Sequence, residues 1–310
     1  MTSVAGSTSS TTRAWGLRRL RRFVPKPVQP MARDLYLRVG PATSRFRMTP
    51  SFIVIGGQRC GTTTIFKSLS DHPQIMRPPV EKGTDYYTLN YSRGFDWYRG
   101  HFPLRSSARL QSRGIPGAKD AVAFEACTYY MFHPLAIERL AKDFPDIKLV
   151  AMLRDPVERA YSAYKHEFAR GFESESSFER ALELEDTRLA GEIERMRADP
   201  DYESIAHRHH AYALRGQYVE QLERVFQHFP REQVHVMESE SFFADPEREY
   251  ASLTAFLGLE TFMPAKFDQH NARPSSPMPQ AAKERLEQHY RSYDERLEQL
   301  LGRRVAWRSS

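Results

Sequence analysis

The sequence predicts an α/β fold with a central, mostly parallel sheet, and three observations support this. Short apolar runs alternate with longer stretches of helical periodicity. One apolar run ends in two glycines and leads into a helix, which is the arrangement of a phosphate-binding loop. The 310 residues are 40% hydrophobic, enough for a substantial core. Strands that alternate with helices pair in parallel through right-handed crossovers.

Four apolar runs are the predicted strands, over residues 52–56, 121–124, 148–153 and 233–237. Predicted helices follow the first three strands, over residues 62–71, 134–143 and 156–170. A last helix over residues 281–301 has an apolar face and is expected to dock on the core. Residues 172–210 form a charged helical insertion, which either packs over the site or is a solvated helical pair.

The first 46 residues are expected to be a basic, partly disordered tail, followed by one domain over residues 47–310. Residues 1–12 have low complexity. Residues 13–24 are compatible with a solvated basic tail or with a short amphipathic helix that contacts a membrane surface weakly. The net charge of +6 lies largely in residues 13–47, and it suits a polyanionic ligand or an anionic membrane surface equally well.

Composition also narrows the function class and the compartment. There is no apolar run of 18 residues for a membrane span and no apolar segment typical of a secretory signal. Two cysteines, Cys60 and Cys127, favour a reducing compartment, so we expect a cytoplasmic protein, with peripheral contact at the inner membrane surface as a variant. No basic motif is interleaved with aromatics, so nucleic acid is not an expected partner. The oligomeric state stays open.

The stretch FIVIGGQRCGTTT, residues 52–64, carries the predicted phosphate loop. The spacing of Gly56 and Gly61 matches a P-loop, but the Lys that a nucleotide triphosphatase needs after the second glycine is missing. Thr62 and Thr63 follow instead, and the cation of the loop is Arg59. The loop therefore suits a phosphate-type anion without a triphosphate–magnesium pair.

A second candidate anion site follows the third strand, in LRDPVERAYSAY, residues 153–164. Asp155 and Pro156 are explained as a helix cap and first helical residue. Capping does not explain Arg154 at the strand tip. Ser162 lies on the same helical face as Asp155, so Arg154 and Ser162 can hold one phosphate from two sides.

The two motifs together resemble those of the sulfotransferases that use 3′-phosphoadenylyl sulfate. GGQRCGTTT resembles their 5′-phosphosulfate loop, and RDPVERAYSAY resembles their 3′-phosphate motif. The likeness is greater to the heparan-type carbohydrate enzymes and their bacterial relatives, and it is supported by LSDHPQI, NYSRGFDWYRGHFP, FEACTYYMFHP and YVEQLERVFQHFP. The resemblance covers roughly residues 50–302.

This resemblance implies a P-loop-like, three-layer fold, with 3′-phosphoadenylyl sulfate as donor and adenosine 3′,5′-bisphosphate as product. Arg59 stands where the family has Lys or Arg, within a donor-binding loop formed by Arg59, Cys60, Gly61, Thr62, Thr63 and Thr64. Arg154 and Ser162 stand at the 3′-phosphate, and Arg273 is a weaker candidate for a basic loop that closes over the donor. Arg59 is expected to stabilise the leaving oxygen. No metal is expected, and the histidines at 207, 209 and 210 are expected to be a solvated face.

The sequence departs from the family at the base that deprotonates the acceptor. Heparan-type relatives have a Glu followed two residues later by His and two aromatics, and here Gly83 stands at the Glu position and Asp85 at the His position. Three carboxylates could replace it: Asp85, which we favour, then Glu81, then Glu125. Many relatives also have a Lys directly after the last of these, where this chain has Ala126.

The predicted function is transfer of a sulfuryl group to a hydroxyl of a carbohydrate, glycolipid or secondary metabolite. Two other classes stay open. One is a P-loop kinase, which the missing Lys after Gly61 disfavours. The other is a nucleotide-binding module that has lost its catalytic base, which the departure at Gly83 keeps in view.

Overall fold

The computed structural model describes residues 29–76, 82–113, 120–268 and 277–308, and its centre is a five-stranded sheet. The strands are β1 (Pro50–Gly56), β2 (Ile75–Met76), β3 (Val122–Ala126), β4 (Lys148–Leu153) and β5 (Val234–Glu238). Their order in the sheet is β2-β3-β1-β4-β5, and every neighbouring pair is parallel. The predicted parallel α/β architecture is therefore confirmed.

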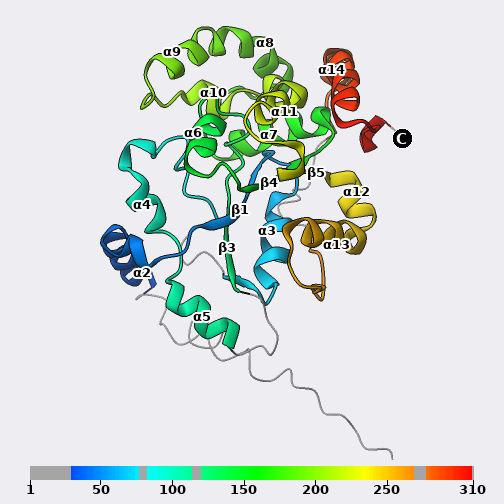
Figure 1. Ribbon diagram of the computed structural model, residues 1–310. Coiled ribbons are helices and arrows are strands. Elements are labelled where there is room, and N and C mark those ends of the chain that lie inside the picture. The colour runs from blue at the N-terminus through cyan, green and yellow to red at the C-terminus, as the bar shows by residue number, and fades with distance from the viewer. Residues whose placement is uncertain (1–28, 77–81, 114–119, 269–276, 309–310) are drawn as a thin grey trace, which may run out of the picture.

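Helices flank the sheet on both sides (Figure 1). They are α2 (Gln29–Val39), α3 (Thr62–Asp71), α4 (Phe95–Arg99), α5 (Arg105–Arg113), α6 (Ala136–Asp143), α7 (Pro156–Ala169), α8 (Phe178–Leu189), α9 (Glu192–Ala198), α10 (Ile205–His209), α11 (Tyr218–Phe226), α12 (Ser239–Ala244), α13 (Pro246–Leu257) and α14 (Gln280–Leu301). Short 3₁₀ turns include η3 (Pro41–Phe46) and η5 (Leu214–Gly216).

The position of β1 determines where the site lies. It is the central strand, with β3 on one side and β4 on the other, and its residues Ile53, Val54 and Ile55 are fully buried. Val54 pairs with Ala126 of β3, and Gly56 pairs with Ala151 of β4. The carboxyl ends of these three strands therefore meet at one edge of the sheet, where ligands of such folds bind.

The predicted elements agree with the structure to within a few residues. The helix predicted over 62–71 is α3, and the strand predicted over 148–153 is β4. The helix predicted over 281–301 is α14, whose Leu286, Tyr290 and Leu297 are buried. Strand β2 was not predicted, because two residues carry no periodicity.

The packed part of the chain begins before the boundary expected at Arg47. The Tyr36 hydroxyl, on α2, donates to the carbonyl of Phe102 (2.7 Å). Ser44, in η3, is buried and its hydroxyl donates to Asp96 Oδ1 (2.6 Å). The segment expected as tail thus contains an ordered helix and turn. Residues 13–24, expected as a solvated basic tail or a short amphipathic helix, lie outside the described residues.

The insertion over residues 172–210 forms α8, α9 and α10, which Figure 1 shows together at one end of the molecule, beside α7 and α11. It packs on the body of the fold rather than standing as a solvated pair. Phe178 and Leu182 of α8 are buried with Tyr161 and Tyr164 of α7 in a second hydrophobic cluster.

Candidate functional site

The predicted phosphate loop joins β1 to α3. Gly61 caps α3 with φ +79°, a left-handed conformation that favours glycine, and a side chain there would meet Met152 Cε at 3.1 Å. The amides of Thr64 and Ile65 both donate to the carbonyl of Gly61. The helix thus begins directly at the loop, and its first amides and its dipole favour an anion at this place.

Arg59 connects the loop to the second predicted anion site. Its Nε donates to Ser162 Oγ at 3.0 Å, and Arg154 Nη1 donates to the Arg59 carbonyl at 3.4 Å. Arg154 follows directly after β4, and Ser162 lies on α7. The structure therefore brings Arg59 together with Arg154 and Ser162, which lie 95 and 103 positions further along the sequence.

Arg154 is positioned by the start of α7. Asp155 caps this helix by accepting from the amides of Val157 (2.8 Å) and Glu158 (3.5 Å), as its sequence predicts. Arg154 forms an ion pair with Glu158 (3.6 Å), and its side chain is 31% exposed. The Arg154 side chain is therefore partly exposed beside the loop.

The other loop residues differ in what they offer. The Cys60 thiol is fully buried, and burial raises its pKa, so only the backbone of this residue can serve a ligand. Thr64 is buried, and its hydroxyl donates to the carbonyl of Asp268 (3.0 Å). Asp268 directly precedes residues 269–276, which contain Arg273 and lie outside the described residues.

Gly83, which stands where the resemblance leads us to expect a glutamate, has no room for a side chain. The Lys82 carbonyl accepts from the amide of Ala126 (2.9 Å), so this segment lies against the end of β3. A Cβ on Gly83 would lie 2.7 Å from the Ala126 carbonyl oxygen, closer than real Cβ atoms come. The backbone at Ala126 therefore occupies the space that the first carbon of a glutamate side chain would need.

Lys82 is a site residue that the sequence reading missed. Its Nζ donates to Thr62 Oγ1 at 3.0 Å, at the first turn of α3. Burial lowers its pKa to about 8, so its ammonium is poorly solvated beside the loop. No local pattern indicates this contact, because it depends on how the segment of Lys82 lies against the end of β3.

Glu125 is a buried hydrogen-bonding centre. Its Oε1 accepts from the Thr84 amide (2.6 Å), the Thr84 hydroxyl (2.7 Å) and the Tyr130 hydroxyl (2.9 Å), while Oε2 accepts from the Tyr98 hydroxyl (2.8 Å). Burial raises its pKa. Tyr86 and Tyr87, which surround this centre with Tyr98, are also buried, so these aromatics belong to the core and do not line a cleft.

Asp85 is held from two sides, in a left-handed conformation with φ +51°. The Cys127 thiol donates to Oδ1 (3.0 Å), and Arg208 Nη2 forms an ion pair with Oδ2 (3.2 Å). The Asp85 side chain is 35% exposed. Arg208 comes from α10, so the insertion contributes directly to this place, which the sequence did not reveal. Glu81 lies outside the described residues.

A buried chain of polar contacts links the loop to the insertion. Gln58 Nε2 donates to Glu167 Oε1 (3.0 Å), and Glu167 Oε2 lies 2.9 Å from His209 Nδ1.

His209 stacks on Phe172 with 3.9 Å between ring centroids. His207 is buried too and bonds to the Tyr129 hydroxyl (2.8 Å). The solvated face expected for these two histidines is therefore wrong; they are packed side chains. Among the described residues, no three His, Cys, Asp or Glu side chains gather as a metal-binding group.

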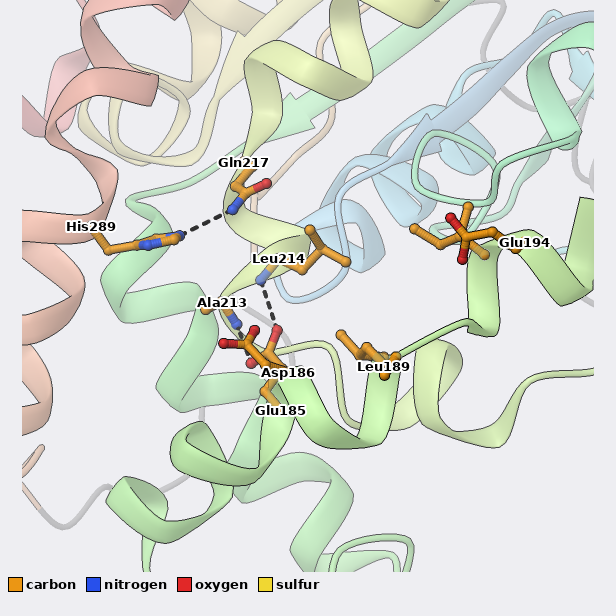
Figure 2. A pocket seen from close by; sticks show the side chains of 10 residues that line it. Glu185, Asp186, Leu189, Glu194, Ala213, Leu214, Gln217 and His289 are labelled. Carbon is orange, nitrogen blue, oxygen red and sulfur yellow. Dashed lines mark hydrogen bonds between the residues drawn. The ribbon is translucent and has the colours of Figure 1, made fainter.

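A separate hollow of about 290 Å³ lies between α8, α9, η5 and α14 (Figure 2). Glu185, Asp186 and Glu194 make it acidic, and Gln217 bonds to His289 at its edge. Glu185 accepts from the amides of Ala213 and Leu214, as Figure 2 shows, so it is satisfied by the fold. None of the predicted site residues lines this hollow, and its acidity does not suit an anionic donor.

Residues 49–283 match a protein family described as the sulfotransferase domain. A membrane-associated sulfotransferase of Dictyostelium discoideum, kil1, is 27% identical over 87% of this chain and 69% of its own length. Human bifunctional heparan sulfate N-deacetylase/N-sulfotransferase 3 is 28% identical over 68% of this chain, which spans only 22% of that relative.

A crystal structure of a sulfotransferase from Alicyclobacillus acidocaldarius is also similar. It has a TM-score of 0.60 and 31% sequence identity, and the match covers 84% of this chain and 99% of that one. Within the described residues, no helix combines the length and apolar character needed to cross a bilayer.

Proposed function

Because this chain belongs to the sulfotransferase domain family, we propose that it moves a sulfuryl group from 3′-phosphoadenylyl sulfate to an acceptor hydroxyl. The family shows that the chain is a sulfotransferase. We propose, in addition, which donor and acceptor it uses and which residues act on them. The observation that carries it is the hydrogen bond between Arg59 and Ser162, with Arg154 beside them. A loop and a helix that each suit an anion meet in one place, which fits a ligand with two phosphate groups.

The donor is held by both motifs. The start of α3, with Gly61, Thr62 and Thr63, holds the 5′-phosphate through helix amides and hydroxyls. Arg154 and Ser162 hold the 3′-phosphate, with a guanidinium on one side and a hydroxyl on the other. Cys60 contributes only its backbone and Thr64 positions the segment at Asp268. Arg273 stays proposed as the cation of a loop over the donor.

The transfer forms a bond between the acceptor oxygen and sulfur and breaks the bond from sulfur to the bridging oxygen of the 5′-phosphate. Arg59 and Lys82 stabilise the negative charge that develops on that oxygen. Arg59 brings a guanidinium that stays protonated, and Lys82 brings an ammonium beside Thr62. Lys82 thereby supplies the cation that is missing at Ala126.

The acceptor proton goes to a carboxylate, and Asp85 remains our first choice. It is partly exposed, whereas Glu125 is buried and accepts four hydrogen bonds from hydroxyl and amide donors. Arg208 must release Oδ2, or Oδ1 must leave the Cys127 thiol and take the proton while Arg208 keeps the carboxylate oriented. Glu81 is the second choice.

The acceptor is proposed to be a hydroxyl of a carbohydrate, glycolipid or secondary metabolite. The name of the human relative refers to heparan sulfate, which favours a carbohydrate. The free thiols of Cys60 and Cys127 favour action in a reducing compartment, the cytoplasm. Contact of the basic N-terminal residues 13–24 with a membrane surface is part of the same proposal.

Calorimetry with adenosine 3′,5′-bisphosphate and adenosine 5′-monophosphate tests the donor site. We expect a preference of 10- to 100-fold for the bisphosphate, about 1.5–3 kcal/mol for a charge-assisted contact. Arg154→Ala should abolish this preference, and Arg180→Ala, which removes an exposed arginine of α8 paired with Glu183, should preserve it. Equal affinity of the unmutated chain for both nucleotides would overturn the proposal.

Radiolabelled sulfate transfer to a panel of hydroxyl acceptors then tests the reaction. Sulfate transfer to any acceptor would exclude the alternative that the chain is a catalytically impaired nucleotide-binding module. ATP turnover that requires magnesium, without sulfate transfer, would instead favour a P-loop kinase.

A further inference from the structure

Helix α2 presents an apolar stripe to solvent. Met31, Leu35 and Val39 are spaced four residues apart and therefore lie on one face of the helix. Their side chains are 72%, 63% and 44% exposed. The opposite side of α2 faces the body, where Tyr36 bonds to Phe102 and stacks under Arg47.

The stripe is part of a larger apolar area. Phe46, at the end of η3, is 54% exposed, and Leu104 and Leu110 are 37% and 60% exposed. An isolated bridge joins Arg47 to Leu104, so the start of α5 lies against the end of η3. Six of the ten large exposed hydrophobic side chains in the described part of the chain thus belong to α2, η3, α5 or the residue just before α5. They lie at the corner of the molecule in Figure 1 that holds α2 and α5.

The same area is basic. Arg38 and Arg45 are exposed, and Arg45 lies over the Phe46 ring, 4.6 Å from its centroid. Arg105 and Arg109 on α5 are exposed as well. In the sequence, residues 13–47 hold ten basic residues and one acidic residue, a net charge of +9, whereas the rest of the chain holds 35 basic and 38 acidic residues, a net charge of −3.

We propose that α2, η3 and α5 form a docking surface for an anionic phospholipid bilayer. Exposed aliphatic and aromatic side chains insert at the boundary between headgroups and acyl chains, and the surrounding arginines contact the phosphates. Charge complementarity favours this partner, because the exposed arginines of α2, η3 and α5 attract anionic headgroups, whereas the chain outside residues 13–47 has a net charge of −3. The inference does not depend on the donor or acceptor.

Flotation with lipid vesicles tests this surface in the full-length chain. The vesicles contain phosphatidylcholine alone or mixed with phosphatidylglycerol, at low and at high salt. We expect binding only to the mixed vesicles, weakened by salt. Leu35→Glu should lower the vesicle affinity by about tenfold or more, and Arg38→Glu combined with Arg45→Glu should do the same.

Met263→Glu is the matched control, since Met263 is 40% exposed and lies outside this area. It should bind vesicles like the unmutated chain. Melting curves and binding of adenosine 3′,5′-bisphosphate, both unchanged in Leu35→Glu, establish that the variants are folded and separate this test from that of the donor site.

Three results would overturn the proposal. One is equal binding of Leu35→Glu and the unmutated chain. Another is binding to neutral vesicles that salt does not affect. The third is a dimer in analytical ultracentrifugation that Leu35→Glu dissociates while vesicle binding is absent, which would assign the stripe to a second copy of the chain.

Discussion

Arg59 Nε donates to Ser162 Oγ at 3.0 Å, although 103 residues separate the two side chains in the sequence. The cation of the phosphate loop and the hydroxyl of the second anion motif therefore belong to one site. Since a guanidinium has five N–H donors in a fixed fork, one arginine can serve neighbouring oxygens on both sides. The proposed roles of Arg59 in transfer and of Arg154 in binding can then be separated by substitution.

Arg59→Ala should lower kcat for sulfate transfer by two orders of magnitude or more, about the effect of removing one preorganised donor from a developing charge. Affinity for adenosine 3′,5′-bisphosphate should change only a few-fold. Steady-state kinetics and calorimetry on the same preparation measure the two effects. Ser162→Ala is the matched control, which removes the partner hydroxyl and should act mainly on affinity. A decrease in turnover of less than about threefold would refute the role of Arg59.

Lys82→Met should lower kcat and raise the melting temperature. The folded-state pKa, about 8, is below the ordinary lysine value, so the charged side chain opposes folding at neutral pH and this cost fades as the pH rises above 8. Removing the charge should stabilise the fold by about 1 kcal/mol, after discounting for partial exposure. Thermal denaturation and initial rates check both effects. A variant with full activity would exclude Lys82 from the site.

The same lysine predicts a pH dependence. If the ammonium of Lys82 is required, kcat/KM should fall as the pH rises through about 8. In Lys82→Arg the guanidinium stays protonated, so this alkaline limb should move to higher pH. An identical limb in both proteins would assign it to another group.

Gly83→Glu should not restore the base of the relatives. Its Cβ would meet the Ala126 carbonyl oxygen at 2.7 Å, which requires a backbone shift and should cost about 2 kcal/mol or more of stability. Gly83→Ala carries the same Cβ without the carboxylate and should be destabilised similarly, as urea denaturation would measure. A Gly83→Glu protein with unchanged stability and raised turnover would contradict this account.

Asp85→Asn should mainly lower turnover, whereas Glu125→Leu should mainly lower the stability of the fold. Asp85→Asn removes the proposed base, so kcat should fall by 10²–10⁴-fold with little change in stability. Glu125→Leu leaves the Thr84 amide and the Tyr98 and Tyr130 hydroxyls without their acceptor, and should destabilise the fold by about 3 kcal/mol or more. Circular dichroism and rate measurements distinguish them, and the reverse pattern would make Glu125 the base.

Much of the fold was predictable, because local signals are strong where the chain is buried or capped. The apolar run at β4 gave the strand bounds, and the glycine before Thr62 gave the start of α3. The cap at Asp155 gave the start of α7, and with it the position of Arg154 and Ser162. Each of these depends on a few neighbouring residues.

The remaining site features depend on contacts between distant segments. Arg208 reaches Asp85 across 123 positions, and no pattern near either residue indicates the pair. The close approach of Gly83 to Ala126 depends on how two backbones meet. His207 and His209 have a polar sequence context but are buried by Phe132 and Phe172, with which they stack. The contact of Lys82 with Thr62, 20 positions away, also depends on how two segments meet in space.

The contact from Gln58 through Glu167 to His209 bears on how this chain can be re-engineered. Helices α8 to α10 interrupt the alternation of strands and helices, so they could be taken for an insertion that can be replaced by that of a relative. Yet a chimera that takes these helices from a relative without an imidazole at 209 would remove one hydrogen-bond partner of the buried Glu167 carboxylate, which also accepts from Gln58 of the predicted phosphate loop. The insertion and its partner Glu167 on α7 would therefore need to be transplanted as one unit.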